Sequence, residues 1–72
     1  MNRYHILPVI NGWVLREERS GSTIVTTETR EQILALAGKL LDGHAARVWV
    51  HRPDGTVEQE LAYPQDKVGD PA

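Results

Sequence analysis

Two β-prone runs, residues 4–10 and 13–19, are separated by the dipeptide Asn11-Gly12. Asn-Gly is the pair that best tolerates positive φ at both central positions of a type I′ turn, which joins two antiparallel strands. The sequence therefore predicts a β-hairpin with a two-residue loop near the start of the chain, and a positive φ at Gly12.

This hairpin divides its side chains between two faces, because successive residues of a strand point to opposite sides. With Asn11 and Gly12 as the loop, Ile10 lies opposite Trp13. The face predicted to be core collects Tyr4, Ile6, Pro8, Ile10, Trp13 and Leu15. We expect Trp13 to be buried between sheet and helix. The other face collects His5, Leu7, Val9, Val14, Arg16 and Glu18, a mixture too apolar for ordinary solvent surface.

A third strand and a helix follow. Residues 23–26 are β-branched and suit a short strand. Thr27 or Thr29 is the expected N-cap, and Thr29 with Gln32 has capping-box spacing. Apolar residues then recur at helical spacing, and Gly43 can take the left-handed conformation that ends a helix. The predicted apolar stripe is Ile33, Leu36, Ala37, Leu40 and Leu41.

Residues 46–52 and 56–63 predict a second hairpin around Pro53-Asp54-Gly55. Its loop length decides which side chains join the core. An even-length loop puts Val48 and Val50 on the same face as Val57 and Leu61, and this gives the better apolar match. A three-residue loop would bring Trp49 and His51 to that face instead.

The predicted order is β-β-β-α-β-β, which implies an α+β two-layer sandwich: a mostly antiparallel sheet with one amphipathic helix on one face. The chain has 72 residues, enough for one core. We expect residues 1–63 to form a single domain and residues 64–72, which are polar and contain two prolines and a glycine, to be a disordered tail. The order of strands in the sheet is left open.

These elements resemble a family of small bacterial proteins known only as a domain of unknown function, numbered twenty-one eighty-eight. The resemblance covers residues 4–63 and implies the fold without implying an activity. The sequence departs from the family pattern at Glu28, which stands near an expected Thr, and at Trp49, where a smaller apolar residue is more usual. The matching pieces are Tyr4-His5-Ile6-Leu7-Pro8, Gly12-Trp13-Val14-Leu15, Glu31-Gln32-Ile33, Val48-Trp49-Val50-His51, Asp54-Gly55-Thr56-Val57 and Tyr63.

No pattern typical of catalysis is present in the sequence. His5, His44 and His51 lie on different predicted elements without paired spacing, so we expect no metal site. A nucleophile elbow and a phosphate-binding loop are both missing, so we expect no catalytic residues and no cofactor. An enzyme acting on a small ligand is the third-ranked hypothesis.

Charge and cysteine content narrow the possible partners and compartments. The formal net charge is −2, with both signs interleaved, which disfavours nucleic acid as a partner. The chain has no cysteine, and its first residues show neither a signal peptide nor a membrane span. We therefore expect a cytoplasmic protein without membrane contact.

The sheet face turned away from the helix is the candidate interaction surface. A five-stranded sheet is about 24 Å wide, whereas one helix is about 10–12 Å across, so much of the sheet stays uncovered. We predict a homodimer, or contact with an unidentified protein partner, and a non-enzymatic interaction or regulatory module. The alternative is a nucleic-acid-associated regulator of the antitoxin kind. The predicted interface is Leu7, Val9, Val14 and Trp49, with Arg16, Arg47 and His51 at its rim.

Overall fold

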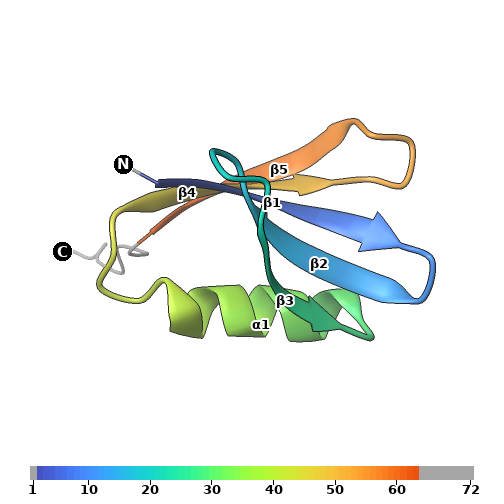
Figure 1. Cartoon of the computed structure of the whole chain (residues 1–72), viewed down its shortest axis with the longest axis horizontal. Coiled ribbons are helices and arrows are strands. Elements are labelled where there is room, and N and C mark those ends of the chain that lie inside the picture. Colours follow the sequence, from blue (N-terminus) through green and yellow to red (C-terminus); the bar gives the residue numbers. More distant parts are fainter. Residues whose placement is uncertain (1, 64–72) are drawn as a thin grey trace, which may run out of the picture.

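A computed structural model describes residues 2–63, which form one five-stranded sheet and one helix (Figure 1). The elements follow in the predicted order β-β-β-α-β-β, and the predicted α+β class is confirmed. The predicted tail, residues 64–72, lies outside the described residues. The bounds are β1 Asn2–Val9, β2 Gly12–Glu17, β3 Thr23–Thr27, α1 Arg30–Leu40, β4 Ala46–His51 and β5 Val57–Tyr63.

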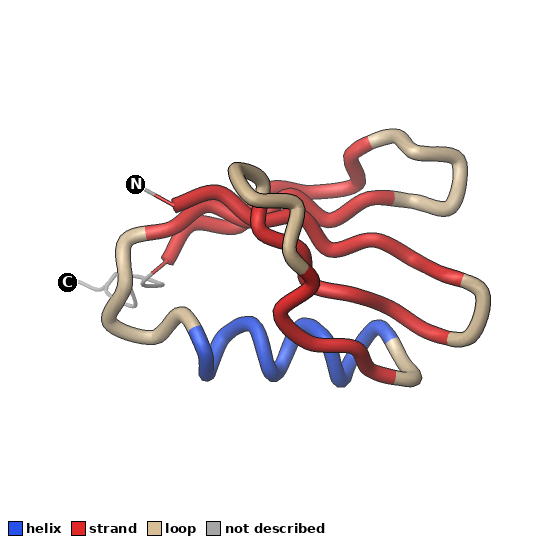
Figure 2. The backbone as a smooth tube through the Cα atoms, viewed as in Figure 1, coloured by secondary structure: helices blue, strands red, loops and turns tan. Residues whose placement is uncertain are grey.

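The strand order in the sheet is β3-β2-β1-β4-β5, so the first strand of the chain lies at the centre. Three neighbouring pairs are antiparallel, and β1 pairs with β4 in parallel. A parallel pair needs a long crossover connection. Here the connection is β2, β3 and α1, with the helix packed against β2 and β3. Figure 2 shows the helix beneath that side of the sheet, with the loop between β4 and β5 away from it.

The first hairpin has a two-residue loop, but one position earlier than predicted. Val9 pairs with Gly12, so Ile10 and Asn11 form the loop, and Ile10 is 97% exposed instead of belonging to the core. The register therefore shifts by two residues, with Pro8 opposite Trp13. A shift of two keeps every other side chain on its predicted face.

Gly12 has a φ of +156°, so the predicted positive φ is confirmed, but the reason differs from the one expected. Within residues 2–63 only glycines have positive φ, so Asn11 does not adopt the conformation that a type I′ turn requires. An added Cβ at Gly12 would collide with the main-chain oxygen of Thr27 on β3. Close approach of two strands explains the glycine.

The helix begins as its sequence predicts, but it ends at Leu40 with Leu41 as its C-cap, so Gly43 is not the residue directly after the cap. Thr29 is the N-cap, and it forms a capping box in which its side chain accepts a hydrogen bond from the Gln32 main-chain N–H. Gly43, in the loop after the helix, has a φ of +81°. Of the predicted stripe, Ile33, Ala37 and Leu41 are buried, Leu36 is half-buried and Leu40 is 46% exposed.

The core lies between α1 and one face of the sheet. Ile6, Leu15, Val48 and Val50 are completely buried there, so the predicted core face of β4 is confirmed. The even-length loop is wrong: the Arg52 main-chain N–H donates to the Thr56 main-chain oxygen, which leaves the three residues 53–55 as the loop. Contrary to the sequence prediction, Val57 does not lie on the core face. A register irregularity between Val50 and His51 pairs Val57 with His51, so Val57 lies on the other face and is 46% exposed.

Trp13 is less enclosed than predicted: it packs against the edge of the core and is only half-buried. It pairs with Pro8 near the end of the first hairpin, where few strand residues extend beyond it. Within residues 2–63 there is no helix long and apolar enough to cross a membrane.

Candidate functional site: the open face of the sheet

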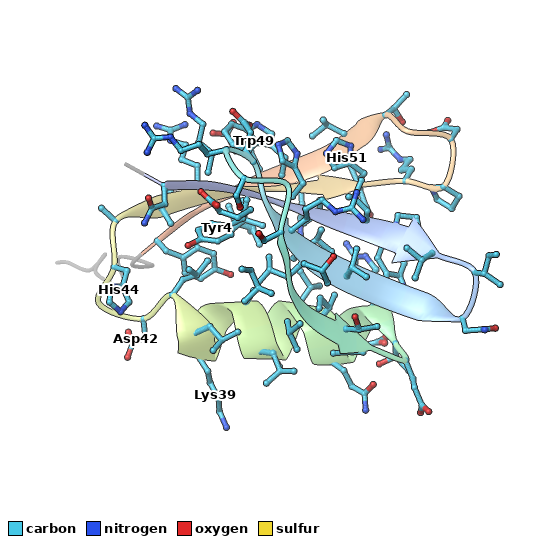
Figure 3. All side chains as sticks on the ribbon, viewed as in Figure 1. Tyr4, Lys39, Asp42, His44, Trp49 and His51 are labelled. Carbon is cyan, nitrogen blue, oxygen red and sulfur yellow. The ribbon has the colours of Figure 1, made fainter. Side chains whose placement is uncertain are left out.

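The face of the sheet turned away from α1, called the open face below, carries the predicted interface residues. Leu7 and Val14 are paired across β1 and β2, as are His5 and Arg16. Figure 3 shows Trp49 and His51 on the side opposite the helix. Strand alternation and register place all seven predicted residues together, namely Leu7, Val9, Val14, Arg16, Arg47, Trp49 and His51.

The apolar part of the open face is less exposed than the sequence suggests. Val14 is only 6% exposed, and Leu7 and Trp49 are half-buried, whereas Val9 is 43% exposed. Val14 lies between its cross-strand neighbours Leu7 and Thr26, so side chains of adjacent strands cover one another. Val57 adds a further exposed apolar side chain beside His51.

One row of residues crosses four strands at the middle of the open face. Arg16 on β2 pairs with His5 on β1, His5 with Trp49 on β4, and Trp49 with Glu60 on β5. The His5 and Trp49 rings stack with centroids 5.5 Å apart and planes 24° from parallel. This stack places an aromatic surface at the centre of the face, the position that binding hot spots favour.

His5 and His51 form a hydrogen-bonded chain with Glu18 and the main chain. His5 Nδ1 lies 2.8 Å from His51 Nε2, and His5 Nε2 lies 2.8 Å from Glu18 Oε1. At the far end His51 Nδ1 lies 3.2 Å from the main-chain oxygen of Gly55. The hydrogen bond from His5 holds the pKa of Glu18 below its usual value of 4.5, so this carboxylate is ionised at neutral pH.

Both signs of charge occur on this face, and two arginines are paired. Arg47 forms an ion pair with Glu60, and Arg3 lies 3.7 Å from Glu18. These ion pairs are largely exposed and contribute little to folding stability. Within residues 2–63, Arg16 makes no ion pair of this kind, so its guanidinium is available to a partner.

The sequence did not indicate that His5 and His51 meet. They are 46 residues apart, and only the parallel pairing of β1 and β4 brings them together. The sequence placed His5 and Glu18 on this face but did not single them out as interface residues, and it assigned Val57 to the core face. His44, the third histidine, lies in the loop after α1, away from His51 (Figure 3). Within the described part of the chain, no three or more His, Cys, Asp or Glu side chains are grouped to hold one metal ion.

Residues 2–63 form a small α+β domain in which the helix covers one face of the sheet and no described element covers the other. The chain belongs to the family described as "Uncharacterized protein conserved in bacteria (DUF2188)", whose model matches residues 4–63. The resemblance expected from the sequence is thus confirmed. Neither the curated proteins nor the solved structures include a match to this chain.

Proposed function

We propose that this protein is a non-enzymatic interaction module that self-associates into a homodimer through the open face. The observation that carries the proposal is Trp49, a large aromatic side chain left half-buried at the centre of a face that no helix or strand within residues 2–63 covers. Tryptophan and arginine are enriched in protein interfaces, and both occur here.

The charge arrangement favours a second copy over nucleic acid. Arg3, Arg16 and Arg47 share the face with Glu18 and Glu60, so a two-fold related copy can pair its arginines with the carboxylates of the first. The same carboxylates repel a phosphate backbone, and they already pair with two of the three arginines. The net charge of −2 acts in the same direction.

The size of the face indicates a weak dimer. The strands are five to eight residues long. A five-stranded sheet with such strands measures about 24 Å by about 20 Å, or about 480 Å² per copy. Two copies would bury about 1,000 Å² in total, at the low end for specific interfaces, so we expect association at micromolar concentration. A cytoplasmic location belongs to the proposal because a cysteine-free chain needs no oxidising compartment.

Sedimentation or light scattering across a micromolar concentration series tests the proposal. The parent should form a concentration-dependent dimer, and Trp49→Glu should be monomeric. Leu40→Glu is the matched control, because Leu40 is a 46% exposed apolar residue of α1, away from the open face, and this variant should dimerise like the parent. Val9→Glu changes a 43% exposed residue of the open face and guards against a folding defect in Trp49→Glu.

A monomeric parent, or unchanged dimers in both Trp49→Glu and Val9→Glu, would refute self-association. The antitoxin-type alternative would then be tested by a gel shift with single-stranded DNA at low salt, where Arg16→Gln should weaken binding.

A further inference from the structure

With two neutral imidazole rings, the three contacts in the chain through His5 and His51 cannot all be hydrogen bonds. A carbonyl oxygen only accepts hydrogen bonds, so the 3.2 Å contact with Gly55 is a hydrogen bond when His51 Nδ1 carries the hydrogen. The Glu18 carboxylate likewise accepts, so His5 Nε2 carries a hydrogen. A neutral imidazole has one N–H, and therefore two lone pairs, on His5 Nδ1 and His51 Nε2, face each other at 2.8 Å.

Two lone pairs at this separation repel unless a positive charge lies between them. A proton can supply it by making one ring an imidazolium. A metal ion can also supply it, because neutral imidazole nitrogen is a ligand for zinc, copper and nickel. The arrangement of the outer nitrogens favours the metal. A metal-ligating histidine characteristically donates its other N–H to a carboxylate or a main-chain carbonyl, and His5 and His51 do so to Glu18 and Gly55 respectively.

We propose that His5 Nδ1 and His51 Nε2 form a two-histidine binding site for a divalent transition metal ion of the zinc and copper class. Glu18 and the Gly55 carbonyl are its positioning groups, and water molecules fill the remaining coordination positions. Both ligands come from one copy of the chain, so the site does not depend on self-association.

The geometry needs a small adjustment to admit the metal. Zinc–nitrogen bonds of about 2.0–2.1 Å at tetrahedral angles place two ligand nitrogens about 3.4 Å apart, so the rings must separate by about 0.6 Å. His51 is the last residue of β4 and adjoins the register irregularity, where the ladder holds the strand least tightly. His5 is held more firmly by its stack with Trp49, and its side chain is 27% exposed, which leaves a path for the ion.

Titration with copper(II) chloride at neutral pH, followed by tryptophan fluorescence, tests the site. Because Trp49 stacks on His5, a bound copper ion should quench its emission and saturate at one ion per chain. Trp49→Phe should remove the quenched component and leave that of Trp13. Zinc chloride should compete and restore the emission, with zinc binding more weakly than copper.

Variants separate ligands from positioning groups. His5→Gln and His51→Gln should each weaken binding by more than tenfold, whereas His44→Gln, at the histidine outside the site, should bind like the parent. Glu18→Gln should weaken binding about tenfold, the effect typical of a lost outer hydrogen-bond partner. Circular dichroism of each variant confirms folding.

The proposal is overturned if the parent shows no saturable binding, which would leave the shared proton as the only cation. Equal binding by the parent, His5→Gln and His51→Gln would overturn it as well. Its failure and that of the proposed dimer are distinguishable when the titration is run at protein concentrations below the micromolar range, where the chain is monomeric, and the dimer is measured separately by mass.

Discussion

The same strands supply residues to both faces of this sheet, and the two faces differ in role. On the face against α1, β1 contributes Ile6 and β4 contributes Val50, both completely buried. One residue away on the same strands, His5 and His51 lie on the open face with their ring nitrogens 2.8 Å apart. Alternation along a strand thus lets two central strands serve the core and a polar site at once. We infer that stability comes from the covered face and binding from the open one.

Ile6→Ala and Leu7→Ala test this division with adjacent residues, and Ile6→Ala should show the largest effect. Ile6 is completely buried, and its truncation leaves a cavity that should cost about 2–5 kcal/mol of unfolding free energy. Leu7 is half-buried on the open face, so its truncation should cost clearly less. Urea unfolding followed by circular dichroism measures both. Equal losses would mean that the two faces contribute alike to stability.

The variants Ile6→Ala and Leu7→Ala should also differ in their effect on self-association. Leu7→Ala should weaken the proposed dimer, whereas Ile6→Ala, measured under conditions where it stays folded, should leave the dissociation constant unchanged. A dimer weakened only by Ile6→Ala would contradict the division between the faces.

The covered face was largely predictable from sequence, because burial imposes a period on the residues. Alternation placed Ile6 and Leu15 in the core, and the better apolar match placed Val48 and Val50 there. The two-residue error in the register of the first hairpin moved only Ile10 out of the core. The capping box at Thr29 was predictable because it depends on residues close in sequence.

The site on the open face was predictable only as a set of candidates. Its central contact joins His5 to His51 through the parallel pairing of β1 and β4, and local sequence carries no signal for which strands become neighbours. Val57 was assigned to the wrong face because one extra residue in β5 interrupts alternation there. Long-range pairing and bulges are thus the two features that periodicity does not encode.

Gly12→Ala probes the close approach of β2 and β3 at Gly12. Its added Cβ would collide with the Thr27 main-chain oxygen, and β3 must move to accommodate it. Gly21→Ala is the control, because Gly21 also has a positive φ, of +73°, but has no atom within 4 Å of its added Cβ. The loss of unfolding free energy in Gly12→Ala should exceed that in Gly21→Ala by about 1–3 kcal/mol, which is the typical cost of overpacking.

Chemical denaturation of the two glycine variants measures this difference. Similar losses would show that backbone conformation alone, and not the approach of β3, requires glycine at position 12.

The smallest expected effect is the pH-dependent contribution of Glu18 to stability, and it reports on the open face alone. The hydrogen bond from His5 lowers the pKa of Glu18 from 4.5, with a smaller contribution from the charge of Arg3. Because the folded-state pKa lies below the unfolded value, ionised Glu18 favours the folded state above pH 4.5, and this contribution disappears as the pH falls through the folded-state pKa. Carboxyl NMR of Glu18 should therefore show a midpoint below 4.5. His5→Gln should return that midpoint toward 4.5, and Arg3→Gln should return it by less. If the titration midpoint of Glu18 is the same in His5→Gln as in the parent, His5 does not contact Glu18 in solution, and the side chains of the open face are separate.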